Sequence, residues 1–209
     1  MMTDMTMDNF LAVLSSSEPV PGGGGACGYV AAVGMSLGNM GLALTTGKKK
    51  YAEYQEEIEE LIVKATDLTK RLAECMDKDA ESFKPLAAAY GLPKDTEEQI
   101  KEREAIMAKA LVTASEAPLS MMELILEAMK LINRISVIGS RIAISDAGVG
   151  ITMCEAAMKG ASLNVFINTK LMKDRELAED MNFKADKMLA EAAQIEEETF
   201  GRVMDAVRP

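Results

Sequence analysis

The chain has 209 residues, and its 48% hydrophobic content is enough for a buried core, which excludes a disordered or fibrous protein. Its 23 basic and 33 acidic residues give a net charge of −10, which argues against general binding to nucleic acid or to an anionic membrane. Histidine is absent, so histidine-dependent nucleophilic catalysis and all histidine-containing metal sites are excluded, and acid–base chemistry must use Asp, Glu, Lys, Cys or Tyr.

The three cysteines are far apart in the sequence and show no CxxC spacing, so the sequence predicts neither a disulfide scaffold nor a zinc site. The N-terminal segment carries acidic residues where a signal peptide would carry basic ones. We therefore expect a cytoplasmic protein with no bound metal and no tightly bound cofactor.

Aromatic residues make up only 4% of the chain, while 17 residues are Met, and this composition favours helices over strands. We expect an all-α helical bundle with long amphipathic helices, forming a single domain over residues 1–209. In chain order, the predicted helices cover about residues 6–15, 26–46, 49–90, 96–116, 118–138, 145–172 and 174–207.

Prolines and capping residues set several of these boundaries. Thr96 and Gln99 have the spacing of a capping box at the start of a helix. Pro118 is expected to begin a new helix, because proline suits the first helical turn. Pro85 lies inside the third predicted helix and is expected to bend it or end it early.

No charged residue lies between Glu18 and Lys48, and this run is long enough for a transmembrane helix. Its abundant small residues suit close helix packing inside a protein equally well, and we expect no membrane insertion. Glycines open the run just before the predicted helix, where backbone N–H groups favour an anion. Gly23, Gly24 and Gly25 are therefore candidate ligands for a carboxylate or phosphate, and a tight turn that lets two helices touch is the alternative.

Three consecutive lysines follow this helix. Lys48, Lys49 and Lys50 form the densest basic cluster on an acidic chain, which makes them a candidate binding site for an anion. The alternative is a solvated helix start with no ligand.

Asp79 falls on the apolar face of the third predicted helix, in step with Leu72, Cys75 and Leu86. Asp77 lies about 200° away around the helix, on the polar face. A carboxylate that faces a core needs a partner or a pocket, and such surroundings can tune its pKa for proton transfer. The alternative is a carboxylate that caps a facing helix or pairs with Lys or Arg.

A second polar irregularity lies further along the chain. Asn164 and Asn168 are one helical turn apart on an otherwise apolar face, where their amides need hydrogen-bond partners from another helix or from a ligand. Ser145 and Asp146 precede them and are candidate ligands as well. A role in capping the helix is a sufficient alternative for this pair.

Six segments with these residues resemble the cyclodeaminase/cyclohydrolase family of tetrahydrofolate enzymes, in matching order and spacing. They are PGGGG at 21–25, LTTGKKKY at 44–51, DKDAESF at 77–83, YGLPK at 90–94, ISDAGVG at 144–150 and LNVFINTK at 163–170. The resemblance implies an all-α domain that dimerises, with folate bound near the glycine loop and the subunit contact. It also implies that Asp79, which matches the aspartate of DxDAxxF, is the catalytic acid–base group.

The chain departs from the family pattern at Gly25, where the family usually has Ser, and at Ser140, where it usually has Asn. Three functions remain open. The resemblance of GKKKY and SDAGVG to stand-alone bacterial enzymes favours a methenyltetrahydrofolate cyclohydrolase. A formiminotetrahydrofolate cyclodeaminase and a non-catalytic helical interaction protein are the alternatives. The expected partners are a folate and a second copy of the chain, and the lysines are expected to hold a polyglutamate tail where the folate carries one.

Overall fold

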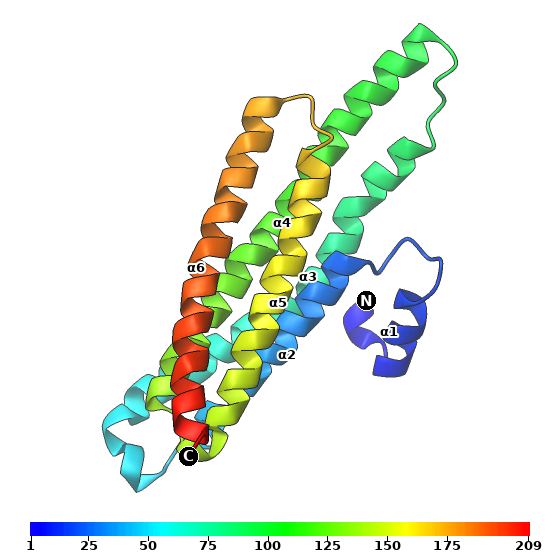
Figure 1. Ribbon diagram of the computed structural model, residues 1–209. Coiled ribbons are helices and arrows are strands. Elements are labelled where there is room, and N and C mark those ends of the chain that lie inside the picture. Colours follow the sequence, from blue (N-terminus) through cyan, green and yellow to red (C-terminus); the bar gives the residue numbers. More distant parts are fainter.

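The computed structural model describes residues 1–209 as a bundle of helices without a strand (Figure 1), which confirms the all-α prediction. The α-helices are α1 (Met7–Leu14), α2 (Gly23–Ala43), α3 (Gln55–Tyr90), α4 (Glu97–Ile138), α5 (Ile144–Thr169) and α6 (Arg175–Val207). Three short 3₁₀ segments cover Met2–Asp4, Lys49–Tyr54 and Arg141–Ala143.

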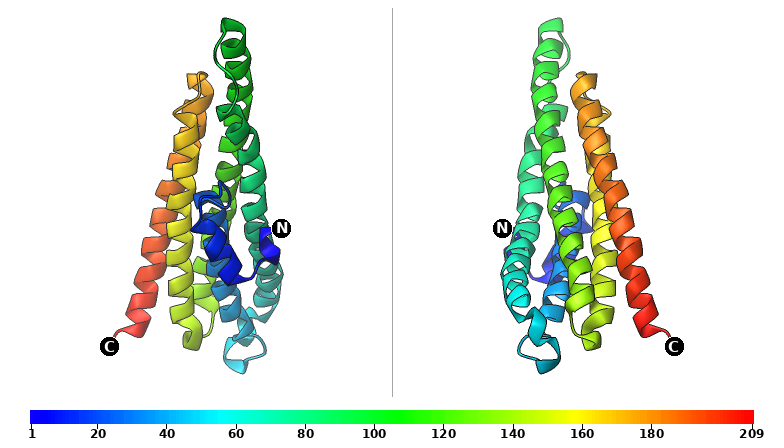
Figure 2. Two further views of the ribbon diagram at one scale, coloured as in Figure 1. Left: turned by 90° about the vertical axis from the view of Figure 1, so that its right-hand side faces the viewer. Right: turned by 90° about the vertical axis from the view of Figure 1, so that its left-hand side faces the viewer.

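Helices α2 to α6 run alongside one another in an elongated bundle, and the short α1 lies at its side (Figures 1 and 2). Helix α4 packs against α2, α3, α5 and α6, while α2 packs against both α3 and α5. The α3–α4 hairpin extends beyond the other helices at one end (Figure 2). Helix α2 begins about halfway along the bundle (Figure 1), so its first turn lies beside the C-terminal halves of α3 and α5, next to Asp79 and Asn164.

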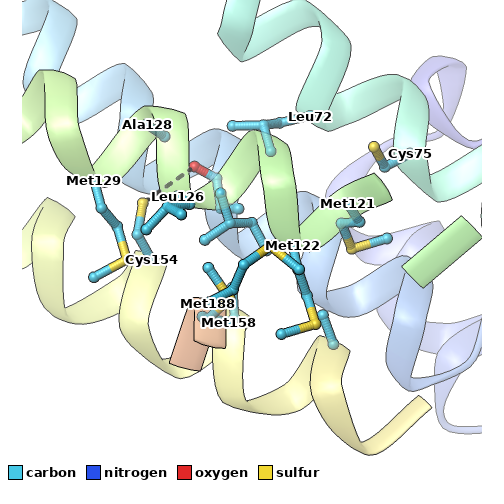
Figure 3. Close-up of a cluster of buried hydrophobic side chains, with 14 of the residues drawn as sticks. Leu72, Cys75, Met121, Met122, Leu126, Ala128, Met129, Cys154, Met158 and Met188 are labelled. Atoms are coloured by element: carbon cyan, nitrogen blue, oxygen red, sulfur yellow. Dashed lines mark hydrogen bonds between the residues drawn. The ribbon is translucent and has the colours of Figure 1, made fainter. Parts of the chain in front are cut away.

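Methionine side chains fill much of the interior. Figure 3 shows Met121, Met122 and Met129 of α4 together with Met158 of α5 and Met188 of α6. Unbranched methionine side chains adapt to irregular gaps between helices, which explains how a chain so poor in aromatic residues forms a dense core.

Helices α2 and α5 approach one another closely through glycine. A Cβ atom on Gly34 would lie 2.8 Å from the carbonyl oxygen of Gly150, and one on Gly150 would lie 2.6 Å from the carbonyl oxygen of Gly34. Helix α2 is the one helix long and apolar enough to cross a membrane by length and composition. Its small residues pack against other helices of the same chain, as expected from the sequence.

The expectation that a new helix begins at Pro118 is wrong, because α4 continues through it without interruption. Proline has no N–H to donate to the carbonyl of Ala114, four residues earlier. The side-chain amide of Asn168 on α5 replaces that donor, with Nδ2 at 2.8 Å from the Ala114 oxygen. A tertiary hydrogen bond therefore lets the helix pass a buried proline.

Pro85 does not end α3 early either, since the helix continues to Tyr90. The carbonyl that loses its helical donor belongs to Glu81, an exposed residue whose backbone water can reach. The predicted capping box is confirmed: Thr96 Oγ1 accepts from the Gln99 N–H at 3.3 Å, and Gln99 Oε1 accepts from the Thr96 N–H at 3.1 Å.

The second and third predicted helices need adjusted boundaries. Helix α2 begins at Gly23, three residues before the predicted start, and ends at Ala43. The segment Lys49–Tyr54 is 3₁₀ rather than the first turns of α3. The glycines are thus part of the helix itself, which brings their backbone against neighbouring helices.

Candidate active site

Asp79 on α3 lies directly against the first turn of α2. A Cβ atom on Gly24 would overlap the Asp79 carboxylate, so only glycine leaves room for it at this position. The N-cap residue of α2, Gly22, has no side chain to bind the free N–H groups of the first turn, and Asp79 accepts a hydrogen bond from the Gly25 N–H. The carboxylate therefore caps α2 from a neighbouring helix, which is one of the alternatives that the sequence left open.

The surroundings of Asp79 favour its protonated form. Burial raises the pKa of this carboxyl above its ordinary value, and the hydrogen bond from Gly25 opposes the shift only in part. No Lys or Arg forms an ion pair with it. A carboxyl whose pKa is raised holds its proton more readily than an ordinary Asp and can still release it, and general acid–base catalysis requires both abilities.

Two asparagines on α5 line the same pocket as Asp79. Asn168 donates its Nδ2 to the Ala114 carbonyl at 2.8 Å, and Asn164 donates its Nδ2 to the Gly160 carbonyl at 3.0 Å. Their Oδ1 atoms have no partner in the protein and are not sealed from solvent. Both side chains therefore present a free hydrogen-bond acceptor.

These groups line one pocket of about 230 Å³. Its walls come from the loop before α2, the first turn of α2, and helices α3, α4 and α5; the lining residues are Pro19, Val20, Gly22, Gly23, Gly24, Asp79, Phe83, Ala114, Asn164, Ile167 and Asn168. The structure thus brings together five predicted site residues from segments far apart in the sequence: Gly23, Gly24, Asp79, Asn164 and Asn168.

Sequence reasoning missed the apolar wall of this pocket. Phe83 lies one turn after Asp79, within the segment that matches DxDAxxF, and its spacing could have identified it. Ile167 lies between the two asparagines and is 63% exposed, and nothing in its pattern separates it from an ordinary surface residue. The resulting pocket combines an apolar surface with a few polar groups, as small-molecule sites do.

Cys27 stands one turn after Gly24 on α2 and faces the same region. Burial and the nearby charge of Asp79 raise the pKa of its thiol to about 11, so it is neutral at physiological pH. A neutral thiol is a poor nucleophile, and Cys27 acts here as a small apolar neighbour of Asp79. No group of three or more Cys, Asp or Glu side chains is arranged to hold a metal ion.

Asp77 lies on a different face of α3 from Asp79, as the helical spacing predicted. Its Oδ1 accepts a hydrogen bond from the N–H of Met2 at 2.8 Å, so it attaches the N-terminal turn to α3. It does not line the pocket.

The lysine cluster lies at the far end of α2. That helix has 21 residues, which places Lys48, Lys49 and Lys50 about 30 Å from the glycine turn of the same chain. Lys48 Nζ donates to Ser140 Oγ at 3.2 Å, and Lys50 lines a second pocket of about 400 Å³ together with Arg141 and other residues. Within one chain, the lysines and the glycine turn do not form one binding site.

Ser145 and Asp146 also lie at that far end, at the start of α5. Neither side chain caps the helix, which has Ala143 at its N-cap and no side-chain capping bond, so the capping alternative is not observed. Ser145 is exposed beside an apolar groove between α5 and α6. These two residues are about 30 Å from Asn164 along α5 and do not join the Asp79 pocket.

Comparison with known proteins assigns the chain to a family. Residues 6–187 match the family described as formiminotransferase-cyclodeaminase. The chain belongs to the formiminotransferase-cyclodeaminase family. It is 37% identical to a methenyltetrahydrofolate cyclohydrolase of Methylorubrum extorquens over 202 residues, which are 97% of each chain.

Other members of the family are more distant. A formimidoyltransferase-cyclodeaminase of Dictyostelium discoideum is 30% identical over 92% of this chain, and that of Mus musculus is 27% identical over 90%. In both cases the match covers only 35% of the relative. The crystal structure of a formiminotetrahydrofolate cyclodeaminase from Thermotoga maritima has the same fold, with a TM-score of 0.85, 21% identity and coverage of 99% of this chain and 98% of that one.

The two departures from the family pattern lie at opposite ends of α2. Gly25 is at the pocket end, where a Cβ atom would lie 3.3 Å from the Cβ of Pro21. Ser140 is at the lysine end, where its N–H donates to Thr45 Oγ1 at 2.7 Å and its hydroxyl accepts from Lys48. Only Gly25 therefore adjoins the pocket of this family member.

Proposed function

We propose that the protein is a methenyltetrahydrofolate cyclohydrolase, which hydrolyses 5,10-methenyltetrahydrofolate to 10-formyltetrahydrofolate. The similarity to the Methylorubrum extorquens enzyme extends over nearly the whole of both chains and supports this reaction. The observation that carries the proposal is the Asp79 pocket, in which a carboxyl of raised pKa stands beside two free amide oxygens.

The polarity of the pocket suits this substrate. Its free side-chain polar atoms are all acceptors: the Asp79 carboxylate and the Oδ1 atoms of Asn164 and Asn168. The amidinium group of methenyltetrahydrofolate is a cation, and its pterin ring carries N–H donors, so an acceptor-rich pocket complements both. The backbone N–H groups of Gly23 and Gly24 have no helical partner and can bind a substrate oxygen.

Asp79 can serve both halves of the reaction. As the carboxylate, it takes a proton from the water that attacks the carbon bridging N5 and N10. As the carboxylic acid, it returns that proton to N5 while the bond between N5 and the bridging carbon breaks. The hydroxyl on that carbon then loses its own proton to solvent as the formyl C=O forms, so hydrolysis of the cationic substrate releases one proton. The same group would then start and finish each turnover in one protonation state, without a cofactor other than the folate substrate.

A cyclodeaminase would use the same carboxyl differently. In that reaction N10 attacks the formimino carbon, and the acid protonates the departing ammonia. An absorbance assay on methenyltetrahydrofolate, run beside an ammonia-release assay on formiminotetrahydrofolate, separates the two. We expect turnover of the methenyl substrate. Ammonia release alone would assign the cyclodeaminase. The absence of both activities would support a non-catalytic interaction protein.

We also propose that the protein is a homodimer formed through α2 and α5. Helix α2 carries no charged residue, and the outer face of α5 exposes Val149, Leu163 and Ile167 at 53%, 68% and 63%. Such a face is stabilised by burial against a second copy. Light scattering at micromolar concentration tests this proposal, and an active monomer would contradict it.

A dimer of this kind would give the lysines a role at the pocket. A two-fold axis across the middle of α2 would bring the Lys48–Lys50 segment of one copy near the glycine turn of the other, where it could bind the carboxylates of a polyglutamate tail. Mixed dimers test this arrangement, with Asp79→Asn in one copy and Lys49→Glu/Lys50→Glu in the other. A wild-type KM for polyglutamylated substrate would support it, because only one site then combines Asp79 with intact lysines; a raised KM would place the lysines and Asp79 in the same chain.

A further inference from the structure

A buried proline on α4 and an asparagine in the pocket are linked through one carbonyl group. Pro118 lies inside α4 and is buried, and its missing N–H leaves the carbonyl of Ala114 without a helical donor. A buried carbonyl without a donor destabilises the folded protein, because the group has lost its hydrogen bonds to water and gained none in return. Asn168 supplies the donor from α5 at 2.8 Å.

This contact fixes the direction of the Asn168 amide. A carbonyl oxygen only accepts hydrogen bonds, so the Asn168 atom that faces Ala114 must be Nδ2 and the Oδ1 must lie on the other side. That oxygen has no protein partner and remains accessible, and Asn168 lines the pocket while being only 9% exposed. Asn168 therefore offers an acceptor and cannot rotate by 180° to offer a donor without leaving the Ala114 carbonyl unpaired.

Asn164 is held less firmly. Its Nδ2 also donates to a backbone carbonyl, but that carbonyl belongs to Gly160, whose usual donor is the backbone N–H of Asn164 itself. Rotation of the Asn164 amide would thus leave no orphan carbonyl. Pro118 therefore fixes the direction of the Asn168 amide, whereas the direction of the Asn164 amide is not fixed in this way.

We infer that Pro118 is a specificity-determining positioning residue: by freeing the Ala114 carbonyl, it makes Asn168 present an acceptor to an N–H group of the substrate ring. The inference rests on the proposed folate function of the pocket. It assigns a functional reason to a proline that interrupts the hydrogen bonding of a long helix. The edge of the substrate ring that contacts the Asn168 Oδ1 must then carry an N–H donor rather than a carbonyl oxygen.

Pro118→Ala tests the inference, because alanine restores an N–H that can donate to Ala114 and compete with Asn168. We expect KM for methenyltetrahydrofolate to rise roughly three- to tenfold, the scale of one hydrogen bond, with kcat within about twofold. The melting temperature should not fall, because alanine is favoured over proline inside a helix. The matched control is Pro85→Ala in α3, where the freed carbonyl of Glu81 belongs to an exposed residue and KM should not change.

A second measurement tests the linkage without any folate. Asn168→Ala should lower the melting temperature of the wild type, because it leaves the Ala114 carbonyl unpaired, and should lower it less in the Pro118→Ala background, where residue 118 supplies the donor. Equal losses in both backgrounds would overturn the inference. An unchanged KM in the active Pro118→Ala enzyme would also overturn it, while leaving the proposed function intact.

Failure of the proposed function can be distinguished from failure of this inference. In that case neither the wild type nor Pro118→Ala would turn over methenyltetrahydrofolate or formiminotetrahydrofolate. The affinity of wild type and Pro118→Ala for tetrahydrofolate, measured by calorimetry, then judges the inference by the same expected three- to tenfold change.

Discussion

The carboxylate of Asp79 occupies the space where a side chain on Gly24 would begin. Asp79 is a charged residue on the apolar face of α3, and Gly24 belongs to the glycine run at the start of α2. The two residues are far apart in the sequence, and the structure brings them into contact. The glycine lets α2 approach α3 so closely that its first turn and the carboxylate form one site. The same closeness buries the carboxyl and raises its pKa.

Replacing Asp79 by Asn should lower turnover at least about 100-fold, the scale of general acid–base catalysis, while the protein still folds. Asn keeps an oxygen that can accept from the Gly25 N–H, so the helix cap survives and only the proton transfer is lost. Asp77→Asn is the matched control, because Asp77 binds the Met2 N–H away from the pocket. We expect Asp77→Asn to be mild, and an essential Asp77 with a dispensable Asp79 would reject the site.

Replacing Gly24 by Ala should displace the Asp79 carboxylate, because the added Cβ has no other space. We expect a fall in kcat approaching that of Asp79→Asn, together with a lower melting temperature. Gly201→Ala on α6 is the control: a Cβ at that helical position meets nothing within 4 Å, so it should raise stability by about 0.5–1 kcal/mol and leave activity unchanged. Calorimetry and steady-state kinetics on both variants check this pair, and full activity of Gly24→Ala would contradict the close contact.

The raised pKa of Asp79 predicts a characteristic pH dependence of activity. The carboxylate form is needed to take the proton from water, so kcat/KM should fall as the pH decreases through a pKa above the ordinary Asp value of 3.8. A pH–rate profile of the wild type measures this limb. A profile that stays flat down to the ordinary Asp range would mean that Asp79 is not the base.

The same shift predicts a pH-dependent effect on stability. The folded state holds the Asp79 proton more tightly than the unfolded state, so its contribution to stability is fully present below the ordinary pKa and is lost as the pH rises through the raised one. Asp79→Asn removes this loss. Its melting temperature relative to the wild type should therefore be higher at pH 7 than at pH 4, and the opposite trend would contradict the direction of the shift.

The sequence was sufficient for the features that depend on local periodicity and capping. The helical phase of Asp79 against Asp77, the capping box at Thr96 and the shared face of Asn164 and Asn168 all follow from spacing within one helix. The helix break predicted at Pro118 failed, because the donor that lets α4 continue comes from another helix, 54 residues away in the chain. Local rules for proline do not include such a partner.

The grouping of binding residues could not be predicted for a related reason. The glycine turn and the lysines are close in sequence, but a straight helix of 21 residues separates them in space. Ser145 and Asn164 are separated in the same way along α5. Residues joined by a helix longer than a few turns are at different ends of a bundle, and only packing between chains could bring them together.

The lysine cluster is expected to bind the polyglutamate tail of the folate. Lys49 and Lys50 are exposed, and replacing both by Glu should raise KM more for polyglutamylated than for monoglutamylated substrate, because the tail carboxylates lose their basic partners. Added salt should reduce the difference, and kcat should change little, since contacts to the tail are similar in the ground and transition states. Lys94→Glu/Lys101→Glu is the matched control: it makes the same change in charge at exposed lysines that form no ion pair. A wild type with equal KM for both substrates, insensitive to salt and to either double substitution, would show that Lys48, Lys49 and Lys50 are a solvated segment without a ligand.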